Sequence, residues 1–186
     1  MSVGINVPNL ITIFRIFMVP LIIWLIVSGE SLLAFMVFVL AGVSDAVDGF
    51  IAKRFELTTE LGAYLDPIAD KLLLVSIYVS LGVRNILPAW LVILVVSRDV
   101  LIIGAFLLSW MLDKPVRVTP LMVSKANTTA QIVLAATVLG SLGFGVELSI
   151  LIWLLIAAVG ALTVVSAAAY LRLWLLHMAN GDGFEL

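Results

Sequence analysis

Long apolar stretches, separated by short segments that contain glycine, proline and charged residues, make up most of the chain. Each stretch has the roughly 20 residues that a helix needs to cross the apolar core of a bilayer. The pattern therefore predicts an all-α integral membrane protein with six transmembrane helices. Because the connections are short, we expect a single domain over residues 1–186. The expected helices are Leu10–Val27, Ser31–Lys53, Thr59–Val83, Ala89–Leu112, Thr119–Leu142 and Val146–Leu176.

The composition agrees with a membrane location and excludes several other classes. Of the 186 residues, 63% are hydrophobic and 12% are charged, which is too little polar surface for a soluble domain of this size. The chain has no cysteine, so disulfides and zinc–thiolate sites are excluded, and no long basic run indicates a nucleic-acid partner. The first apolar stretch lacks a preceding basic cluster and a small-residue cleavage site, so we expect it to remain as a helix.

Lysine and arginine residues near the predicted helix ends are unevenly distributed between the two sides of the membrane. Arg84 lies alone on one side. Because basic residues concentrate in cytoplasmic loops, the more basic side and both chain termini are predicted to be cytoplasmic. The expected membrane is a bacterial plasma membrane. The basic residues on the predicted cytoplasmic side are Lys53, Arg54, Lys114, Arg117 and Arg172.

A polar stretch over residues 44–71 interrupts the apolar pattern and contains four aspartates. Asp45 and Asp48 are three residues apart, and Asp66 and Asp70 are four apart, so each pair lies on one face of its helix. Acids at membrane depth stay ionised only if their charge is cancelled, and two divalent cations are the simplest means. Oxygen ligands favour Mg²⁺ or Mn²⁺. The alternative is that these residues cap solvated helix ends.

Small and basic residues lie next to these acids. Gly49, Ala52 and Gly62 leave room for a second helix or a phosphate group to approach closely. Lys53 and Arg54 provide the positive charge that a metal-bound diphosphate would need. The stretch therefore indicates a diphosphate substrate beside the metals, in a site that opens to the cytoplasmic side.

The polar stretch resembles the signature of the CDP-alcohol phosphatidyltransferases, D-x2-D-G-x2-A-R-x8-G-x3-D-x3-D. Every gap has the expected length, and the departure is Lys53, because the family usually has arginine there. Lysine keeps the positive charge but lacks the two-pronged geometry of a guanidinium group. The matching positions are Asp45, Asp48, Gly49, Ala52, Gly62, Asp66 and Asp70.

The resemblance implies an enzyme that transfers a phosphatidyl group from CDP-diacylglycerol to an alcohol and releases CMP. It also implies a homodimer. Asp45, Asp48 and Asp66 would bind one divalent cation, and Asp45, Asp66 and Asp70 a second. Asp70, the last acid of the motif, is the expected general base for the acceptor hydroxyl. The residues expected to contact the CDP-lipid are Gly49, Ala52, Lys53 and Gly62.

Three basic residues are candidates for binding the phosphate of the acceptor. Arg15 lies on a polar stripe of the first predicted helix, and such a stripe should face protein or a water-filled cleft. Arg98 lies near mid-membrane with Asp99 beside it to hold it in place, and Lys125 lies near the start of the fifth predicted helix. Alternatively, Arg15 and Lys125 extend to the membrane interface, and Arg98 and Asp99 form a purely structural ion pair.

Two subfamilies differ in the acceptor alcohol. CMP-forming cardiolipin synthases use phosphatidylglycerol, whereas phosphatidylglycerophosphate synthases use glycerol 3-phosphate and commonly have arginine–glutamate in the fourth helix and a second lysine in the fifth. This chain has Arg98 followed by Asp99, and Asn127 in place of that lysine, so it resembles the cardiolipin enzymes more. Phosphatidylglycerol carries about one negative charge and glycerol 3-phosphate about two, so fewer cations suit phosphatidylglycerol. Arg15 or Lys114 could supply the missing cation.

Two other functional classes remain open. A small ion transporter could use the aspartates as an ion path, although the sequence has no visible internal repeat. A structural membrane subunit would leave the acids unexplained. Metal-dependent release of CMP would separate the enzyme from both. Lys71 could pair with another acid or anchor its helix at the membrane interface. His177 is expected past the last membrane segment, as a surface residue without a chemical role.

Overall fold

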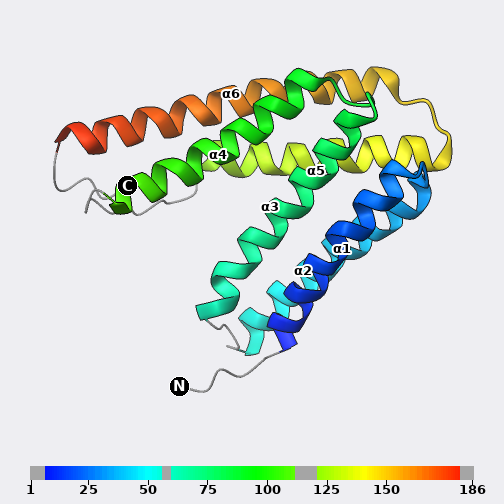
Figure 1. The fold of residues 1–186 in the computed structure, drawn as a ribbon, viewed down its shortest axis with the longest axis horizontal. Coiled ribbons are helices and arrows are strands. Elements are labelled where there is room, and N and C mark those ends of the chain that lie inside the picture. The colour runs from blue at the N-terminus through cyan, green and yellow to red at the C-terminus, as the bar shows by residue number, and fades with distance from the viewer. Residues whose placement is uncertain (1–6, 56–59, 112–120, 181–186) are drawn as a thin grey trace. The chain divides into compact units, whose positions relative to one another are not determined.

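The computed structural model describes residues 7–55, 60–111 and 121–180, which form six helices (Figure 1). No strand occurs in these ranges, so the all-α prediction is confirmed for them. Side chains are described there except at residues 7–13, 46–55, 60–68, 106, 107, 110, 179 and 180. The helices are α1 (Val7–Val27), α2 (Ser31–Phe55), α3 (Glu60–Val83), α4 (Ala89–Met111), α5 (Met122–Phe144) and α6 (Ser149–Asn180).

The observed helix ends lie close to the predicted ones, and the largest difference is at the end of α6. This helix continues to Asn180 instead of ending at Leu176. The sequence has no glycine or proline between Leu176 and Gly181, so nothing in it stops the helix earlier. His177 therefore lies in the last turn of α6, and the predicted helix end at Leu176 is too early.

The chain divides into two compact units. Unit 1 comprises Met1–Leu87 and Ala135–Leu148, and unit 2 comprises Pro88–Leu134 and Ser149–Leu186. Unit 1 therefore contains α1, α2, α3 and the C-terminal part of α5, whereas unit 2 contains α4, α6 and the N-terminal part of α5. Both units are built by packing helices on helices, and the prediction of a single domain stays a prediction.

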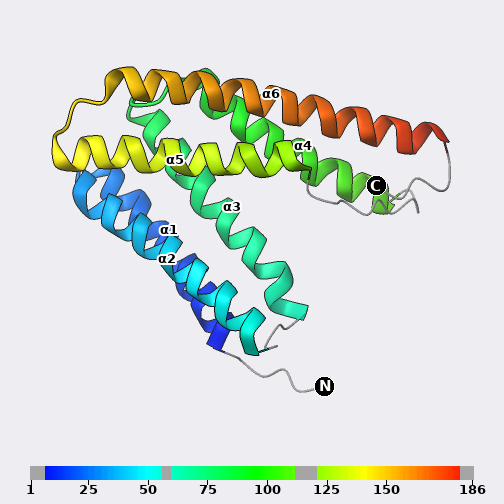
Figure 2. The same ribbon diagram turned by 180° about the vertical axis from the view of Figure 1, so that it is seen from behind.

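In unit 1, α1 packs against both α2 and α3, and the two ribbon views show α1 and α2 side by side (Figures 1 and 2). A residue in the left-handed conformation follows shortly after each of α1 and α3, namely Gly29 (φ 86°) and Asn85 (φ 56°). An N–H group just past each helix donates to a carbonyl five residues earlier at 2.9 Å, which closes the helix end. Nη1 of Arg84, the residue after α3, also donates to the carbonyl of Ile26 at 2.8 Å and so caps the end of α1.

The C-terminal part of α5 approaches α2 very closely within unit 1. A Cβ atom on Gly143 would lie 2.9 Å from the Cα of Leu32, and one on Gly140 would lie 3.3 Å from the ring of Phe35. The rings of Phe35 and Phe144 lie edge to face, with centroids 5.5 Å apart. Glycine at position 143 therefore permits a backbone approach that a Cβ atom would prevent, whereas a Cβ atom at position 140 would require the Phe35 ring to shift slightly.

In unit 2, α4 packs against α6. A Cβ atom on Gly160 would lie 3.1 Å from the ring of Trp90, and Trp174 Nε1 donates to Oγ of Ser109 at 2.9 Å. The interior of this unit is unusually polar for apolar helices. Its buried polar side chains include Arg98, Asp99, Ser109, Asn127, Gln131, Thr163 and Ser166.

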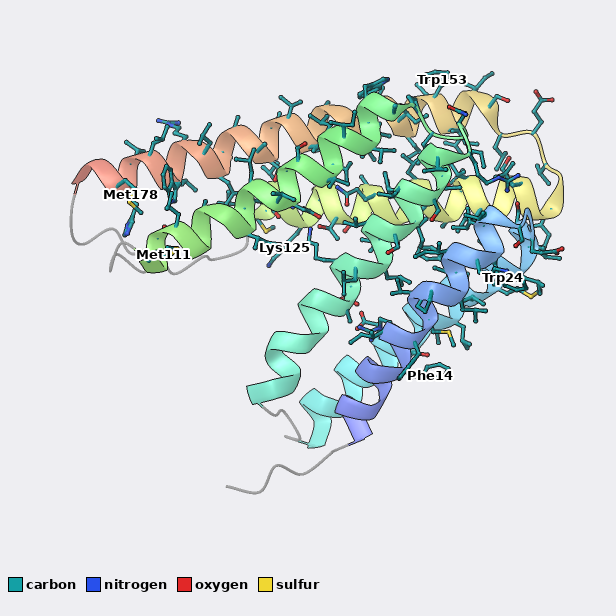
Figure 3. All side chains as sticks on the ribbon, in the orientation of Figure 1. Phe14, Trp24, Met111, Lys125, Trp153 and Met178 are labelled. Carbon is teal, nitrogen blue, oxygen red and sulfur yellow. The ribbon has the colours of Figure 1, made fainter. Side chains whose placement is uncertain are left out.

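Two helices in the described ranges are long and apolar enough to cross a membrane, namely α5 and residues Ser149–Met178 of α6, and shorter apolar stretches lie in α1 and α2. Many large apolar side chains are exposed. Among them, Phe14, Trp24 and Trp153 project outward from their helices (Figure 3). Exposed apolar surface of this extent suits contact with lipid. These features indicate a membrane protein, while the number of six spans stays a prediction.

Candidate active site

Arg15 of α1 lies between one aspartate of α2 and one aspartate of α3. Its Nη2 atom is 2.7 Å from Oδ1 of Asp45, and its Nη1 atom donates a hydrogen bond to Oδ1 of Asp70 at 2.6 Å. These are the first and the last acids of the signature. The fold of unit 1 therefore brings carboxylates from α2 and α3 to the same guanidinium group.

Local packing sets the positions of these three side chains. Ala69, the neighbour of Asp70, is fully buried, and Leu73 in the next turn is also buried, so Asp70 lies beside the packed face of α3. On α2, Ala41 is buried one turn before Asp45. Because α1 packs against both helices, one long side chain from α1 can reach both acids.

Burial is unequal across the three charged groups. The side chain of Arg15 is 1% exposed, whereas those of Asp45 and Asp70 are 47% and 46% exposed. A buried guanidinium group needs anions beside it, but half-exposed carboxylates remain accessible from outside. Nε of Arg15 is buried and has no hydrogen-bond partner in the described part of the chain. The acids, and not the arginine, are therefore the accessible groups of this site.

Several predicted residues of this site have side chains outside the described residues. Their roles stay predictions, although α2 and α3 include their backbones. Lys71, predicted to pair with another acid or to anchor its helix at the interface, is half-buried next to Asp70. The predicted residues concerned are Asp48, Gly49, Ala52, Lys53, Gly62 and Asp66.

The chemistry of the described donors suits a hard divalent cation. Oδ1 of Asp45 and Oδ1 of Asp70 contact one guanidinium group, so the two carboxylates converge from different helices. Carboxylate oxygens are preferred ligands of Mg²⁺ and Mn²⁺, and half-exposed acids leave room for water and substrate oxygens. The carboxylates of Asp45 and Asp70 therefore fit the predicted metal. Among the described side chains, no three acidic, histidine or cysteine residues come together, and the side chains of Asp48 and Asp66 lie outside the described residues.

Arg98 of α4 is the centre of a buried polar cluster in unit 2. Its Nη1 atom donates to Oδ1 of Asp99 at 2.6 Å, and its Nη2 atom donates to the hydroxyls of Ser124 (2.5 Å) and Ser166 (2.7 Å). Its Cζ atom is 5.6 Å from the centre of the Tyr170 ring, within cation–π range. Side chains from α4, α5 and α6 thus fix its orientation. The predicted role of Asp99, to hold Arg98 in place, agrees with this geometry.

The first turns of α5 carry two other residues singled out in the sequence. Lys125 is exposed and projects from the start of the helix (Figure 3). Asn127 is fully buried, and its Oδ1 atom accepts a hydrogen bond from Oγ1 of Thr163 at 2.9 Å. Its Nδ2 atom is buried without a hydrogen bond in the described part of the chain. Asn127 therefore faces α6, whereas Lys125 is available to a ligand.

Three α6 residues of this cluster are absent from the sequence-based predictions, namely Thr163, Ser166 and Tyr170. They are three and four residues apart, so they lie on one face of the helix. A polar stripe of this spacing in an apolar helix is the signal that could have identified them, and the same signal pointed to Arg15. Arg98 reaches Ser166 and Tyr170 from α4, whereas Thr163 donates to Asn127 of α5.

We predict that Asp99→Asn lowers the free energy of unfolding by about 3–5 kcal/mol, because it leaves the buried Arg98 charge without its counter-charge while keeping the side-chain shape. Denaturant unfolding of the purified protein in detergent micelles would measure this. Ser166→Ala is the matched control, with an expected loss of about 1 kcal/mol from one hydrogen-bonding group. Equal stabilities of Asp99→Asn and the unaltered protein would contradict the buried ion pair.

Proteins similar to this chain include two kinds of phosphatidyltransferase. The human cardiolipin synthase (CMP-forming) is 33% identical over 181 residues, covering 89% of this chain and 60% of the human protein. The CDP-diacylglycerol–glycerol-3-phosphate 3-phosphatidyltransferase of Escherichia coli K12 is 34% identical over 174 residues, covering 89% of this chain and 93% of the Escherichia coli protein. The rice (Oryza sativa subsp. japonica) CDP-diacylglycerol–glycerol-3-phosphate 3-phosphatidyltransferase 1, chloroplastic, is 36% identical over 187 residues, covering 89% of this chain and 56% of the rice protein. The chain thus spans little more than half the length of the rice and human relatives.

The match to the family is not confined to the aspartate signature. The profile described as CDP-alcohol phosphatidyltransferase matches residues 5–176. This range contains Arg15 with its two aspartates and also the Arg98 cluster of unit 2. The similar proteins with either name are phosphatidyltransferase enzymes. The chain belongs to the CDP-alcohol phosphatidyltransferase family.

Proposed function

We propose that the protein is a CMP-forming cardiolipin synthase. It transfers the phosphatidyl group of CDP-diacylglycerol to a glycerol hydroxyl of phosphatidylglycerol and releases CMP. The observation that carries the proposal is the convergence of Asp45 and Asp70 from two helices on one buried arginine, at the first and last acids of the family signature. That arrangement provides accessible carboxylates next to a positive charge, which suits a diphosphate substrate.

Each predicted residue has a place in this chemistry. Two divalent cations, Mg²⁺ or Mn²⁺, would be held by Asp45, Asp48, Asp66 and Asp70 and would supply charge stabilisation to the diphosphate. The acceptor hydroxyl attacks the phosphorus on the lipid side, the bond from that phosphorus to the CMP oxygen breaks, and the hydroxyl proton passes to Asp70. The half-exposed side chain of Asp70 can meet such a hydroxyl. The residues proposed to contact the CDP-lipid are Gly49, Ala52, Lys53 and Gly62.

The charge around Arg98 supports phosphatidylglycerol as the acceptor. Arg98 is paired with the buried Asp99, so the two together carry no net charge, and Lys125 adds one positive charge near Ser124. The phosphodiester of phosphatidylglycerol carries about one negative charge, whereas a phosphate monoester carries about 1.5 to 2. Asn127 adds no charge. The residues proposed to bind the acceptor phosphate are Arg15, Arg98 and Lys125.

Six transmembrane helices in a bacterial plasma membrane, an aspartate site open to the cytoplasm and a homodimer complete the proposal. The orientation rests on the excess of basic residues on one side. Arg84, the basic residue on the opposite side, donates to the carbonyl of Ile26 and so has a structural role as a helix cap. Its presence therefore weighs little against the proposed orientation.

Glycerol 3-phosphate is the second candidate acceptor. It is favoured by one observation, because the Escherichia coli protein named as a glycerol-3-phosphate phosphatidyltransferase matches this chain over 93% of its own length. In that case the protein would be a phosphatidylglycerophosphate synthase with the same first substrate and the same release of CMP. A small ion transporter has no support from a family whose similar members are enzymes.

We expect the purified protein, given CDP-diacylglycerol and Mg²⁺, to make cardiolipin from phosphatidylglycerol and to release CMP. Thin-layer analysis of the lipid product with each acceptor in turn would show this. Removal of divalent cations with EDTA should abolish transfer, because the diphosphate charge would no longer be stabilised. Product formed with glycerol 3-phosphate alone would assign the second acceptor instead. CMP release that is independent of metal would contradict the proposed chemistry.

We expect Asp70→Asn to lower the rate of transfer by about 10²–10⁴-fold, because asparagine cannot accept the hydroxyl proton. Binding of CDP-diacylglycerol should persist, since the other three acids of the signature remain. Radiolabelled transfer assays and equilibrium binding of the CDP-lipid would separate these effects. If binding and transfer are lost together, Asp70 serves only as a metal ligand and the assignment of the general base is wrong.

A further inference from the structure

We infer that Arg15 is the counter-ion of the carboxylate site before metal binds, and that a divalent cation must displace its guanidinium group from Asp45 and Asp70. The inference rests on the proposed metal site. In this role Arg15 positions the two acids before the metal binds, and it can contact a phosphate afterwards.

The three charged groups are buried to different extents. Arg15 is 1% exposed, so water cannot solvate its charge, and the two carboxylates are the groups that compensate for it. Asp45 and Asp70 are about half exposed and do not depend on the arginine to the same extent. The arginine therefore holds the acids in a defined arrangement while they remain open to an arriving cation.

Arg15 contacts the carboxylate oxygens that a metal ion would bind. Both guanidinium contacts are made to Oδ1 atoms, at 2.7 Å from Asp45 and 2.6 Å from Asp70. A Mg²⁺ ion binds carboxylate oxygens at about 2.0–2.1 Å, so a metal on the same oxygens would face a positive charge a few ångströms away. Metal and guanidinium group therefore compete for these carboxylates. The positive charge of Arg15 should weaken metal binding in the absence of substrate.

The free hydrogen-bonding capacity of Arg15 indicates its role after this exchange. Its Nε atom is buried and has no hydrogen-bond partner in the described part of the chain. A guanidinium group released from two carboxylates gains further donors, and phosphate oxygens are suitable acceptors for them. One side chain can thus neutralise the acids before the metal arrives and face an anionic substrate afterwards.

The test is the Mn²⁺ affinity of the full-length protein in detergent, stripped with EDTA and kept free of CDP-lipid, with unbound Mn²⁺ measured by electron paramagnetic resonance. Arg15→Met should bind Mn²⁺ at least about tenfold more tightly than the unaltered protein, because one positive charge a few ångströms from the metal is removed. Arg15→Lys, which keeps the charge, should remain within about threefold. In EDTA, Arg15→Met should melt at a lower temperature and should regain stability with Mn²⁺.

Arg84→Met is the matched control. It removes the same charge from the same helix pair, but Arg84 contacts the end of α1 at Ile26, about 16 Å along the helix from Arg15. Its Mn²⁺ affinity should equal that of the unaltered protein. If Arg15→Met does not fold, Arg15→Gln carries the same expectation, because it also removes the charge and keeps donors for the acids.

The outcomes separate this inference from the proposed function. Unchanged or weaker Mn²⁺ binding in both neutral variants of Arg15, with metal-dependent transfer intact in the unaltered protein, would overturn the counter-ion role alone. An unaltered protein that binds no Mn²⁺ and yet transfers the phosphatidyl group would overturn the metal site and the inference with it. Tighter binding in Arg15→Met but not in Arg84→Met would establish the competition.

Discussion

A buried guanidinium group needs an anion beside it, and each of the two helical units is organised around one such group. Arg15 in unit 1 is 1% exposed and Arg98 in unit 2 is 2% exposed, so neither charge is solvated by water. Unit 1 meets the requirement with Asp45 and Asp70 from two neighbouring helices, and unit 2 meets it with the adjacent Asp99. In an apolar helical protein, this requirement determines which polar residues must come together.

The two clusters satisfy the same requirement in different ways, and the difference bears on function. Arg98 and Asp99 are both buried, and hydroxyl groups from two other helices contact Arg98, so the orientation of its guanidinium group is fixed. The carboxylates around Arg15 are half exposed, so this group is open to ligands. Chemistry that requires accessible acids therefore belongs to unit 1. The Arg98 pair is better suited to holding polar groups of α4, α5 and α6 in a fixed arrangement.

The sequence predicted what depends on local pattern. Apolar stretches predicted the six helices closely, and the spacing of Asp45 and Asp70 within the signature indicated that these acids act together. Contacts that depend on which helices become neighbours were not predicted. The sequence placed Arg15 on a cavity wall where it could meet a phosphate, and that stays a prediction. Its contacts with two acids were not foreseen, because no sequence pattern links α1 to α2 and α3. Likewise, the closeness of Gly143 to Leu32 results only from the packing of α5 on α2.

The central claim is that the acids gathered around Arg15 bind divalent cations. The most direct measurement is anomalous X-ray scattering from crystals of the protein soaked in Mn²⁺. We expect anomalous peaks at coordination distance from the carboxylates of Asp45 and Asp70, with the guanidinium group of Arg15 moved away from at least one of them. Crystals that show no manganese at these carboxylates, with both arginine contacts retained, would contradict it.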